Sequence, residues 1–410
     1  IIREKEEHMG IAKNKKKDIG LDFLQRIHFR RRQGKYAVCN GLQELYGDKW
    51  TKEFFDEWED IEEAPTEFYD FKNQNIDVST VISESFDSEI LRQFCNYLYD
   101  YKDYIKGNIL DIGCESGYMT AFLAMYFPEA RITSIDRSEN AVNIAKERLN
   151  RFGITNVQFK ITDVKDLDEQ YDTVISMRTL MENIATSVIN NDIFQGKEFS
   201  YQFQRNKEET QRYADTILNV LKDGGHLISL ERLMVSPLEY GWLSALNASN
   251  CAYLQSTLRH IDCMEVAMKR HFTAFVAQKG KQIDDELIRR FVIEDLLNVN
   301  DEDSGWISTT FCNGWPAIAY FLEHKGERIV DNFIIKQGDD IGCVGRAAAY
   351  VDRDDRDKLL YFIIANSFPK ASTRILDINM KDQILSEIET WTKEQESIGF
   401  KRSSMWPISS

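Results

Sequence analysis

The chain of 410 residues lacks the cysteine and histidine patterns that build metal sites and disulfide frameworks. Its seven cysteines are scattered without a C-x-x-C pair, and its six histidines include no H-E-x-x-H motif. An odd number of irregularly spaced cysteines argues against paired disulfides and against a structural zinc site. We therefore expect no metal centre, and a reducing, cytoplasmic environment.

Long apolar runs are also missing. The most apolar stretch, Leu359–Ala365, is far shorter than the roughly 20 residues that a membrane-spanning helix needs. The first residues, Ile1–Lys5, carry charges, but no apolar segment follows them. We therefore expect neither a secretory signal nor a membrane span.

Positive charge is scarce beyond the N-terminal segment. Residues 1–35 carry 11 Lys and Arg against 5 Asp and Glu, a net charge of +6. The other 375 residues carry 40 basic and 62 acidic side chains, a net charge of −22. Since binding to phosphate backbones relies on clustered cations, we do not expect nucleic acid as a partner of this acidic body. The basic arm, which contains Lys15–Lys17 and Arg30–Arg32, either touches an acidic partner or is a solvated helix face.

At roughly 150 residues per domain, the length predicts two or three domains, and the sequence pattern changes twice along the chain. Residues 1–105 have apolar side chains at helical spacing and are expected to form a helical N-terminal extension or cap. Residues 281–410 are expected to form a smaller α+β domain, which is also our candidate surface for a homodimer. Its expected elements are a helix at 284–297, antiparallel strands at 328–336, 342–351 and 358–366, and a helix at 380–398.

Residues 106–280 alternate short β-type runs with helical patterns. Strands are expected at 108–112, 131–135, 157–161, 173–176 and 226–230, with helices at 118–127 and 207–221 and a closing strand at 271–277. Strands that alternate with helices indicate a parallel sheet covered on both faces. We therefore predict an α/β fold with a doubly wound, mostly parallel sheet.

The most informative segment is Leu110–Tyr118, which follows the first strand and opens a helix. It contains Asp111 and two glycines four positions apart, Gly113 and Gly117. Glycine is needed where the backbone turns sharply and lies against a ligand without a Cβ in the way. The helix that follows offers unpaired N–H groups and the positive end of its dipole. The segment therefore predicts a ligand site at the end of the first strand.

Two further carboxylates end the next two strands. Asp136 ends the second strand, where it can accept both hydroxyls of a ribose. Asp163 ends the third strand, where it can meet an exocyclic amine of a purine. Doubly wound folds bind ligands at the carboxyl ends of their parallel strands, so three acids after successive strands indicate one shared site.

These segments, together with Tyr171–Ser176 and Leu221–Leu227, resemble the class I S-adenosylmethionine-dependent methyltransferases over about residues 107–280. The resemblance implies S-adenosylmethionine as cofactor, with Asp111 and Gly113 facing its methionine end, Asp136 its ribose and Asp163 its adenine. The residues that it implies in cofactor binding are Asp111, Gly113, Cys114, Gly117, Asp136, Arg137, Asp163, Val164 and Met177. One departure is Glu115, because the family usually has glycine at this position.

A dinucleotide-binding dehydrogenase shares the expected topology but fits these residues less well. Its fingerprint, G-x-G-x-x-G, lets the backbone approach a pyrophosphate. Here Glu115 replaces the middle glycine, and its negative charge is unfavourable beside phosphates. Asp111 instead suits the sulfonium and ammonium charges of S-adenosylmethionine, so we favour a methyltransferase.

The acceptor side of the family lies after the fourth and fifth strands, where this sequence has Arg178, Glu182 and Glu231. Methyl transfer needs alignment and a dry pocket, and an oxygen or nitrogen acceptor also benefits from a nearby base. Glu182 and Glu231 are candidate catalytic bases or acceptor-orienting groups, and Arg178 is a candidate clamp for an acidic acceptor. Alternatively, Glu231 and Arg232 form a surface pair, and Arg178 supports the cofactor loop.

The sequence thus favours methyl transfer to oxygen or nitrogen of a small organic acceptor. The long connection between residues 183 and 207, with Ile189, Phe194 and Phe199, forms either a roof over this acceptor or a contact with the C-terminal domain. The N-terminal helices are a further candidate wall. Two alternatives stay open: a protein or tRNA methyltransferase that docks through the basic arm, and a cofactor-binding scaffold without turnover.

Overall fold

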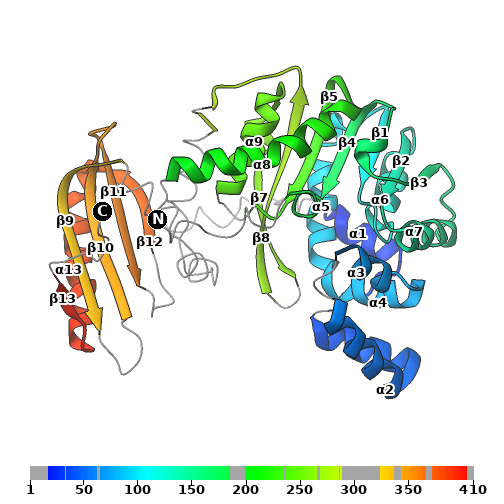
Figure 1. Ribbon diagram of the computed structural model, residues 1–410, viewed down its shortest axis with the longest axis horizontal. Coiled ribbons are helices and arrows are strands. Elements are labelled where there is room, and N and C mark those ends of the chain that lie inside the picture. The colour runs from blue at the N-terminus through cyan, green and yellow to red at the C-terminus, as the bar shows by residue number, and fades with distance from the viewer. Residues whose placement is uncertain are drawn as a thin grey trace, which may run out of the picture.

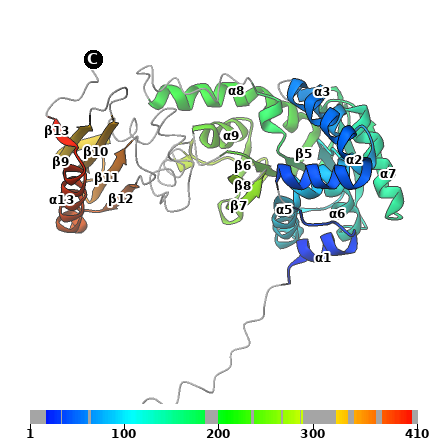
Figure 2. The same ribbon diagram turned by 90° about the horizontal axis from the view of Figure 1, so that it is seen from below.

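The computed structural model describes residues 17–32, 34–61, 65–184, 199–233, 237–265, 268–285, 287–288, 324–336, 343–365 and 372–403. Two β-sheets organise these residues, one of eight strands and one of five (Figure 1 and Figure 2). Several expected features lie outside the described residues. They are most of the basic arm, the end of the helix predicted at 284–297, and the connection that contains Ile189 and Phe194.

The larger sheet has the strand order β3-β2-β1-β4-β5-β8-β6, and β7 also pairs with β8. Its strands are β1 (Asn108–Ile112), β2 (Arg131–Asp136), β3 (Val157–Ile161), β4 (Tyr171–Met177), β5 (Leu221–Glu231), β6 (Cys251–Tyr253), β7 (Arg259–Glu265) and β8 (Met268–Lys279). Strands β1 to β5 are parallel, whereas β8 runs antiparallel to β5, β6 and β7. This confirms the predicted doubly wound, mostly parallel sheet. The strand order reverses between β1 and β4, which is where such sheets open a crevice.

Helices cover both faces of this sheet, because buried side chains alternate along its strands. Ile109 in β1 and Ile228 in β5 pack in one core with helices α1, α5 and α6. Their sequence neighbours Leu110 and Leu227 point to the opposite face and pack with α8 and α9. Each strand therefore contributes to two cores, as expected for a parallel sheet between two helical layers. The helices are α1 (Ile19–Arg26), α5 (Ser88–Asp100), α6 (Tyr118–Tyr126), α8 (Phe199–Val220) and α9 (Pro237–Ala248).

Helices α2 (Lys35–Ile61), α3 (Pro65–Lys72) and α4 (Ile76–Phe86), together with Asp87, form what we call the cap. The cap has a core of its own, built mainly from aromatic and β-branched side chains. Helices α1 and α5 instead share the core of the α/β domain, so the helices before β1 do not form one unit. Figure 1 shows α2 at the outer edge of the molecule, with α3 and α4 nearer to the sheet.

The smaller sheet is antiparallel, with the order β12-β11-β10-β9-β13, and helix α13 (Lys381–Ser397) packs on it. Its strands are β9 (Lys325–Lys336), β10 (Cys343–Asp352), β11 (Lys358–Ala365), β12 (Ser372–Asp377) and β13 (Lys401–Ser403). The predicted α+β composition is confirmed, with the three expected strands and the last helix. The sequence pattern does not predict β12 and β13, because short edge strands have one partner and need few apolar side chains.

Among the helices described, none is both long and apolar enough to cross a membrane. Within the same residues, no three or more His, Cys, Asp or Glu side chains are grouped so that they could hold a metal ion.

Gly117→Ala is expected to destabilise the α/β domain more than Gly153→Ala. Both glycines have positive φ, 84° and 72°, where a side chain costs roughly 1–2 kcal/mol. At Gly117 a Cβ would also lie 2.8 Å from Ala145 Cβ and 2.9 Å from Ala145 Cα, whereas nothing lies within 4 Å at Gly153. Denaturant unfolding should show a loss above about 2 kcal/mol for Gly117→Ala and about 1 kcal/mol for the control. Equal losses would contradict the steric argument.

Candidate active site

A cavity of about 310 Å³ lies between the carboxyl ends of the central strands and the cap. Its volume is at the lower end of the range for small-molecule sites. From the α/β domain it is lined by Asp111, Gly113, Cys114, Glu115, Asp136, Arg137, Asp163, Val164, Met177, Arg178, Glu182 and Arg232, among others. From the cap it is lined by Lys35, Trp58, Phe68, Tyr69, Lys72, Phe86 and Asp87. The cap therefore forms a wall of the site, which is one of the roles considered for the N-terminal helices.

The loop after β1 connects the ends of three strands. Gly113 has a φ of 68°, and a Cβ there would lie 2.9 Å from Thr179 Cγ2 in the loop after β4. Next to it, the Cys114 amide donates a hydrogen bond of 2.9 Å to the carbonyl oxygen of Ile135 in β2. The positive φ and the close approach of Thr179 explain why position 113 needs glycine.

Asp136 and Asp163 face the same cavity. The Asp136 carboxylate accepts hydrogen bonds of 2.9 Å from the amides of Glu115 and Ser138, and burial raises its pKa. Asp163 accepts a hydrogen bond of 3.2 Å from the Lys165 amide and is half-buried. A carboxylate has about four lone-pair sites, so both side chains retain capacity to accept hydrogen bonds from a ligand.

Asp111 lies deeper, at the end of β1. Its Oδ2 accepts hydrogen bonds of 2.5 Å from Thr120 Oγ1 and 3.2 Å from Ser134 Oγ. Burial raises the pKa of Asp111 to about 6, so the carboxylate is ionised at neutral pH. The neighbouring Cys114 thiol has a pKa well above its usual range because it is buried, and it stays protonated.

All residues that the resemblance implied in cofactor binding line this cavity except Gly117. Gly117 instead begins α6, where its missing Cβ allows contact with Ala145. The structure thus brings together side chains from the ends of β1, β2, β3 and β4, which lie far apart in the sequence.

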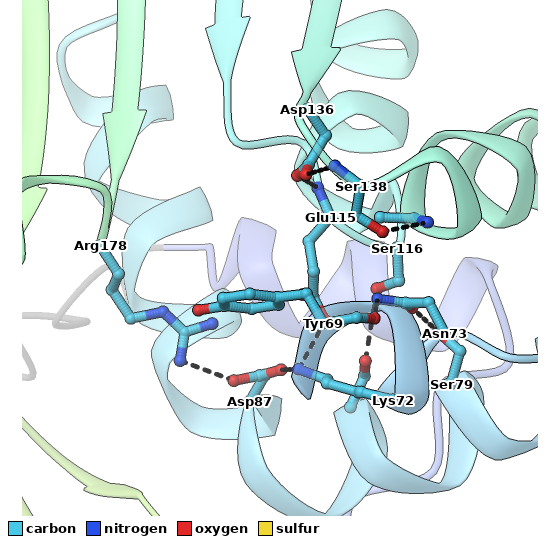
Figure 3. A network of polar contacts seen from close by, with 12 residues as sticks. Tyr69, Lys72, Asn73, Ser79, Asp87, Glu115, Ser116, Asp136, Ser138 and Arg178 are labelled. Carbon is cyan, nitrogen blue, oxygen red and sulfur yellow. Dashed lines mark hydrogen bonds and ion pairs between the residues drawn. The ribbon is translucent and has the colours of Figure 1, made fainter. Parts of the chain in front are cut away.

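Four charged side chains of alternating sign form a row across the cavity wall, and we call it the charge row (Figure 3). Lys72 Nζ lies 2.5 Å from Glu115 Oε1 and 3.9 Å from Asp87 Oδ2. Arg178 Nη1 lies 2.8 Å from Asp87 Oδ1. Two of these ion pairs, Lys72–Glu115 and Arg178–Asp87, join the cap to a loop of the α/β domain, whereas Lys72–Asp87 lies within the cap.

The neighbouring charges keep the buried members of this row ionised. Burial alone would lower the pKa of Lys72, but Glu115 and Asp87 raise it above its usual value. Burial would raise the pKa of Asp87, but Arg178 and Lys72 lower it. Arg178 was a candidate clamp for an acidic acceptor, and the structure shows that this guanidinium contacts a carboxylate of the protein itself.

Glu182, a candidate base, lines the cavity in a short turn after β4. Its Oε1 accepts a hydrogen bond of 3.3 Å from the Tyr69 hydroxyl of the cap. Burial raises the pKa of Tyr69 to about 12, so this hydroxyl stays protonated and acts as a donor. Glu182 therefore combines access to the cavity with a fixed orientation.

Glu231, the other candidate base, is fully buried and is not among the residues that line the cavity. Its carboxylate accepts hydrogen bonds from Ser176 Oγ at 2.8 Å, the Leu180 amide at 3.1 Å and the Thr179 amide at 3.3 Å. Burial raises the pKa of Glu231 to about 7. The alternative of a surface pair with Arg232 is wrong for this residue, because its side chain anchors the loop after β4 inside the protein.

The sequence analysis missed the cap residues Tyr69, Lys72 and Asp87. Their pattern in the sequence is that of ordinary helix residues, and only the fold brings them to the strand ends. One signal was present, because an acidic residue at position 115, in a buried loop, needs a nearby cation. The sequence gives no means of choosing that cation among 51 Lys and Arg residues.

Comparison with known proteins shows which proteins this sequence resembles. A family model described as a methyltransferase domain matches residues 105–289. A malonyl-[acyl-carrier protein] O-methyltransferase from Bacillus cereus is 29% identical over 178 residues, which cover 38% of this chain and 61% of that protein. A protein of the same name from Acetivibrio thermocellus is 35% identical over 97 residues, which cover 22% of this chain and 33% of that protein. The chain thus spans about a third to about three fifths of the length of these relatives.

Among solved structures, the N-methyltransferase NodS from Bradyrhizobium japonicum, in complex with S-adenosyl-L-homocysteine, is 15% identical. It matches 53% of this chain and 98% of its own, with a TM-score of 0.38.

The family match, the mostly parallel sheet and the cavity at its strand ends coincide in one segment of the chain. By this match residues 105–289 are a methyltransferase domain, and this segment contains all eight strands of the larger sheet.

Proposed function

We propose that this protein transfers the methyl group of S-adenosylmethionine to an oxygen or nitrogen atom of a small organic acceptor. The observation that carries the proposal is that Asp111, Asp136 and Asp163, which lie at or just beyond the ends of three different strands, line one cavity. The cofactor has a cationic methionine part, a ribose with two hydroxyls, and an adenine with an exocyclic amine. One carboxylate is available for each part, in the order in which the strands lie in the sheet.

The residues at the strand ends fit this cofactor. The ionised Asp111 would attract the ammonium group, and Asp136 would accept the ribose hydroxyls with the lone pairs left by its two backbone hydrogen bonds. Asp163 would accept from the adenine amine. S-adenosylmethionine, when bound, supplies a methyl group on a positively charged sulfur, which needs no further activation.

The remaining task of the protein is to align the acceptor and to exclude water. Aromatic side chains of the cap, Trp58, Phe68 and Phe86, line the cavity and make it partly apolar. Glu182 is the candidate base, since it lines the cavity and is oriented by Tyr69. Alignment and a dry site are the main sources of rate enhancement in a direct displacement, and a base adds to them when the acceptor carries a proton.

The size of the cavity supports a small acceptor. A cavity of about 310 Å³ is at the lower end of the range for small-molecule sites, which favours a small molecule, or a small group presented by a larger one, as the acceptor. The acidic body supports this choice over a nucleic acid. The two relatives from Bacillus cereus and Acetivibrio thermocellus are named O-methyltransferases, which favours an oxygen acceptor.

Asp136→Ala is expected to weaken binding of S-adenosyl-L-homocysteine by at least about thirtyfold, because it removes a charged acceptor from the ribose hydroxyls. Calorimetry measures this affinity. Asp166→Ala is the matched control, since Asp166 is exposed in the neighbouring turn and is not part of the cavity lining. Unchanged affinity in Asp136→Ala, with the variant folded, would refute the assignment.

The affinity for S-adenosylmethionine is expected to fall as the pH is lowered below 6. Burial raises the pKa of Asp111 to about 6, so its carboxylate takes up a proton below that pH and loses its attraction for the cationic ligand. For one titrating group the affinity falls about tenfold per pH unit below the pKa and is level above it. Calorimetry between pH 5 and 7 should show this step in the wild type, and Asp111→Asn should lack it. A step of equal size in the variant would assign the titration to another group.

A screen of cell metabolites with methyl-labelled S-adenosylmethionine is expected to yield a labelled product. With that acceptor, Glu182→Gln should lower kcat by about 10²-fold to 10⁴-fold, because it removes the base but leaves the cofactor contacts. Glu208→Gln, at an exposed position of α8, is the control. Tight cofactor binding without any labelled product across the screen would favour the scaffold over the enzyme.

A further inference from the structure

Two residues at the cavity adopt a backbone conformation that side chains rarely take. Glu115, in the loop after β1, has a φ of 46°, and Arg178, after β4, has a φ of 60°. Such conformations cost of order 1 kcal/mol or more and persist only where the surroundings hold them. Both residues are charged, and each contacts an opposite charge of the cap. The cap therefore holds both strained loops in place through ion pairs with the side chains of Glu115 and Arg178.

Lys72 is the cation in contact with Glu115. Its side chain is 8% exposed and that of Glu115 is 19% exposed, so the pair is largely shielded from water. Asp87, the second carboxylate near Lys72, lies 3.9 Å from Nζ and has a closer partner in Arg178 at 2.8 Å. Loss of Lys72 would therefore affect Glu115 more than Asp87.

The backbone of Glu115 is connected directly to the carboxylate that faces the ligand. The Glu115 amide donates a hydrogen bond of 2.9 Å to Asp136 Oδ2, while the Ser138 amide donates to Oδ1. The position of the Asp136 carboxylate thus depends on the backbone conformation of Glu115. Figure 3 shows this sequence of contacts from Lys72 through Glu115 to Asp136.

We propose that Lys72 is a positioning residue of the cofactor site, a role that rests on the proposed function. By pairing with the Glu115 carboxylate, Lys72 holds the loop after β1 in the conformation in which the Glu115 amide orients Asp136 towards the ribose. Lys72 acts through Glu115 and does not need to touch the cofactor. The cap thereby affects the affinity of a site whose three carboxylates proposed to bind the cofactor belong to the α/β domain.

The test is a double-mutant cycle between Lys72→Met and Glu115→Gly, with the affinity for S-adenosyl-L-homocysteine measured by calorimetry. In the wild-type background, Lys72→Met should weaken binding at least about tenfold, because a buried carboxylate loses its counter-charge. Glycine at position 115 has no charge to neutralise and adopts a positive φ without strain. In the Glu115→Gly background, adding Lys72→Met should therefore change the affinity less than about twofold.

Three further variants complete the experiment. Lys72→Arg keeps the charge and should restore most of the affinity lost in Lys72→Met. Lys52→Met, at an exposed position of cap helix α2, should bind like the wild type. Glu115→Gln repeats the cycle with a Cβ retained at position 115. Circular dichroism and thermal melting establish that each variant is folded.

The outcomes separate the possible roles of Lys72. A double variant that unfolds, or that binds at least tenfold more weakly than Glu115→Gly, would overturn the proposal, because Lys72 would then act on the ligand or on Asp87. Lys72→Met with near-wild-type affinity would also overturn it. If Lys72→Met fails to fold while the double variant folds and binds like Glu115→Gly, the proposal is supported. Failure of the wild type to bind the ligand at all would instead refute the proposed function.

Discussion

The cavity is organised by the need to compensate charges that have been removed from water. A buried ion costs several kcal/mol unless an opposite charge and hydrogen bonds replace its hydration. Here Lys72 and Asp87 are almost fully buried, and each is kept ionised by neighbours of opposite sign. Because the two inner charges of the row, Lys72 and Asp87, come from the cap and the two outer ones from strand-end loops, Glu115 and Arg178 meet their opposite charges only when cap and domain are docked in this arrangement.

Burial raises the pKa values of buried carboxylates outside the charge row, whereas neighbouring cations lower the pKa of Asp87 within it. The pKa of Asp111 rises to about 6 and that of Glu231 to about 7, although both accept several hydrogen bonds. Asp136 follows the same direction. Asp111 and Asp136 face the cavity, and burial is the main cause of the raised pKa of both, so a cationic ligand there would offset the cost of burying their negative charges. Their raised pKa values are thus a physical reason for the site to prefer a cation.

Much of the fold could be predicted because its signals are local. Each of the first five strands has alternating or continuous apolar side chains, and the helices between them have apolar faces, so their alternation predicts a covered parallel sheet. The acids after β1, β2 and β3 could be placed in one site, since the carboxyl ends of parallel strands meet at one edge. Short edge strands such as β13, and the boundary between α4 and α5, carry weaker local signals and were not predicted.

The acceptor side was harder to predict, because its geometry depends on contacts between distant segments. Glu182 and Glu231 follow neighbouring strands and look equivalent in the sequence. In the structure Glu182 lines the cavity, whereas Glu231 turns inward to bind the backbone of the loop after β4. Whether an acid at a strand end faces the cavity or the protein interior therefore depends on which backbone amides lie within hydrogen-bonding distance of its carboxylate.

By itself the sequence determined the sheet, the ligand edge and the three acids, because strand periodicity and glycine positions act over a few residues. The tertiary structure decided which cation meets Glu115, which of the two candidate bases lines the cavity, and that the cap forms one of its walls. Burial and ion pairing act between residues that are near in space, and Lys72 is 43 positions from Glu115 in the chain. A local sequence pattern cannot relate residues this far apart, so Lys72 becomes the partner of Glu115 only when the helices pack.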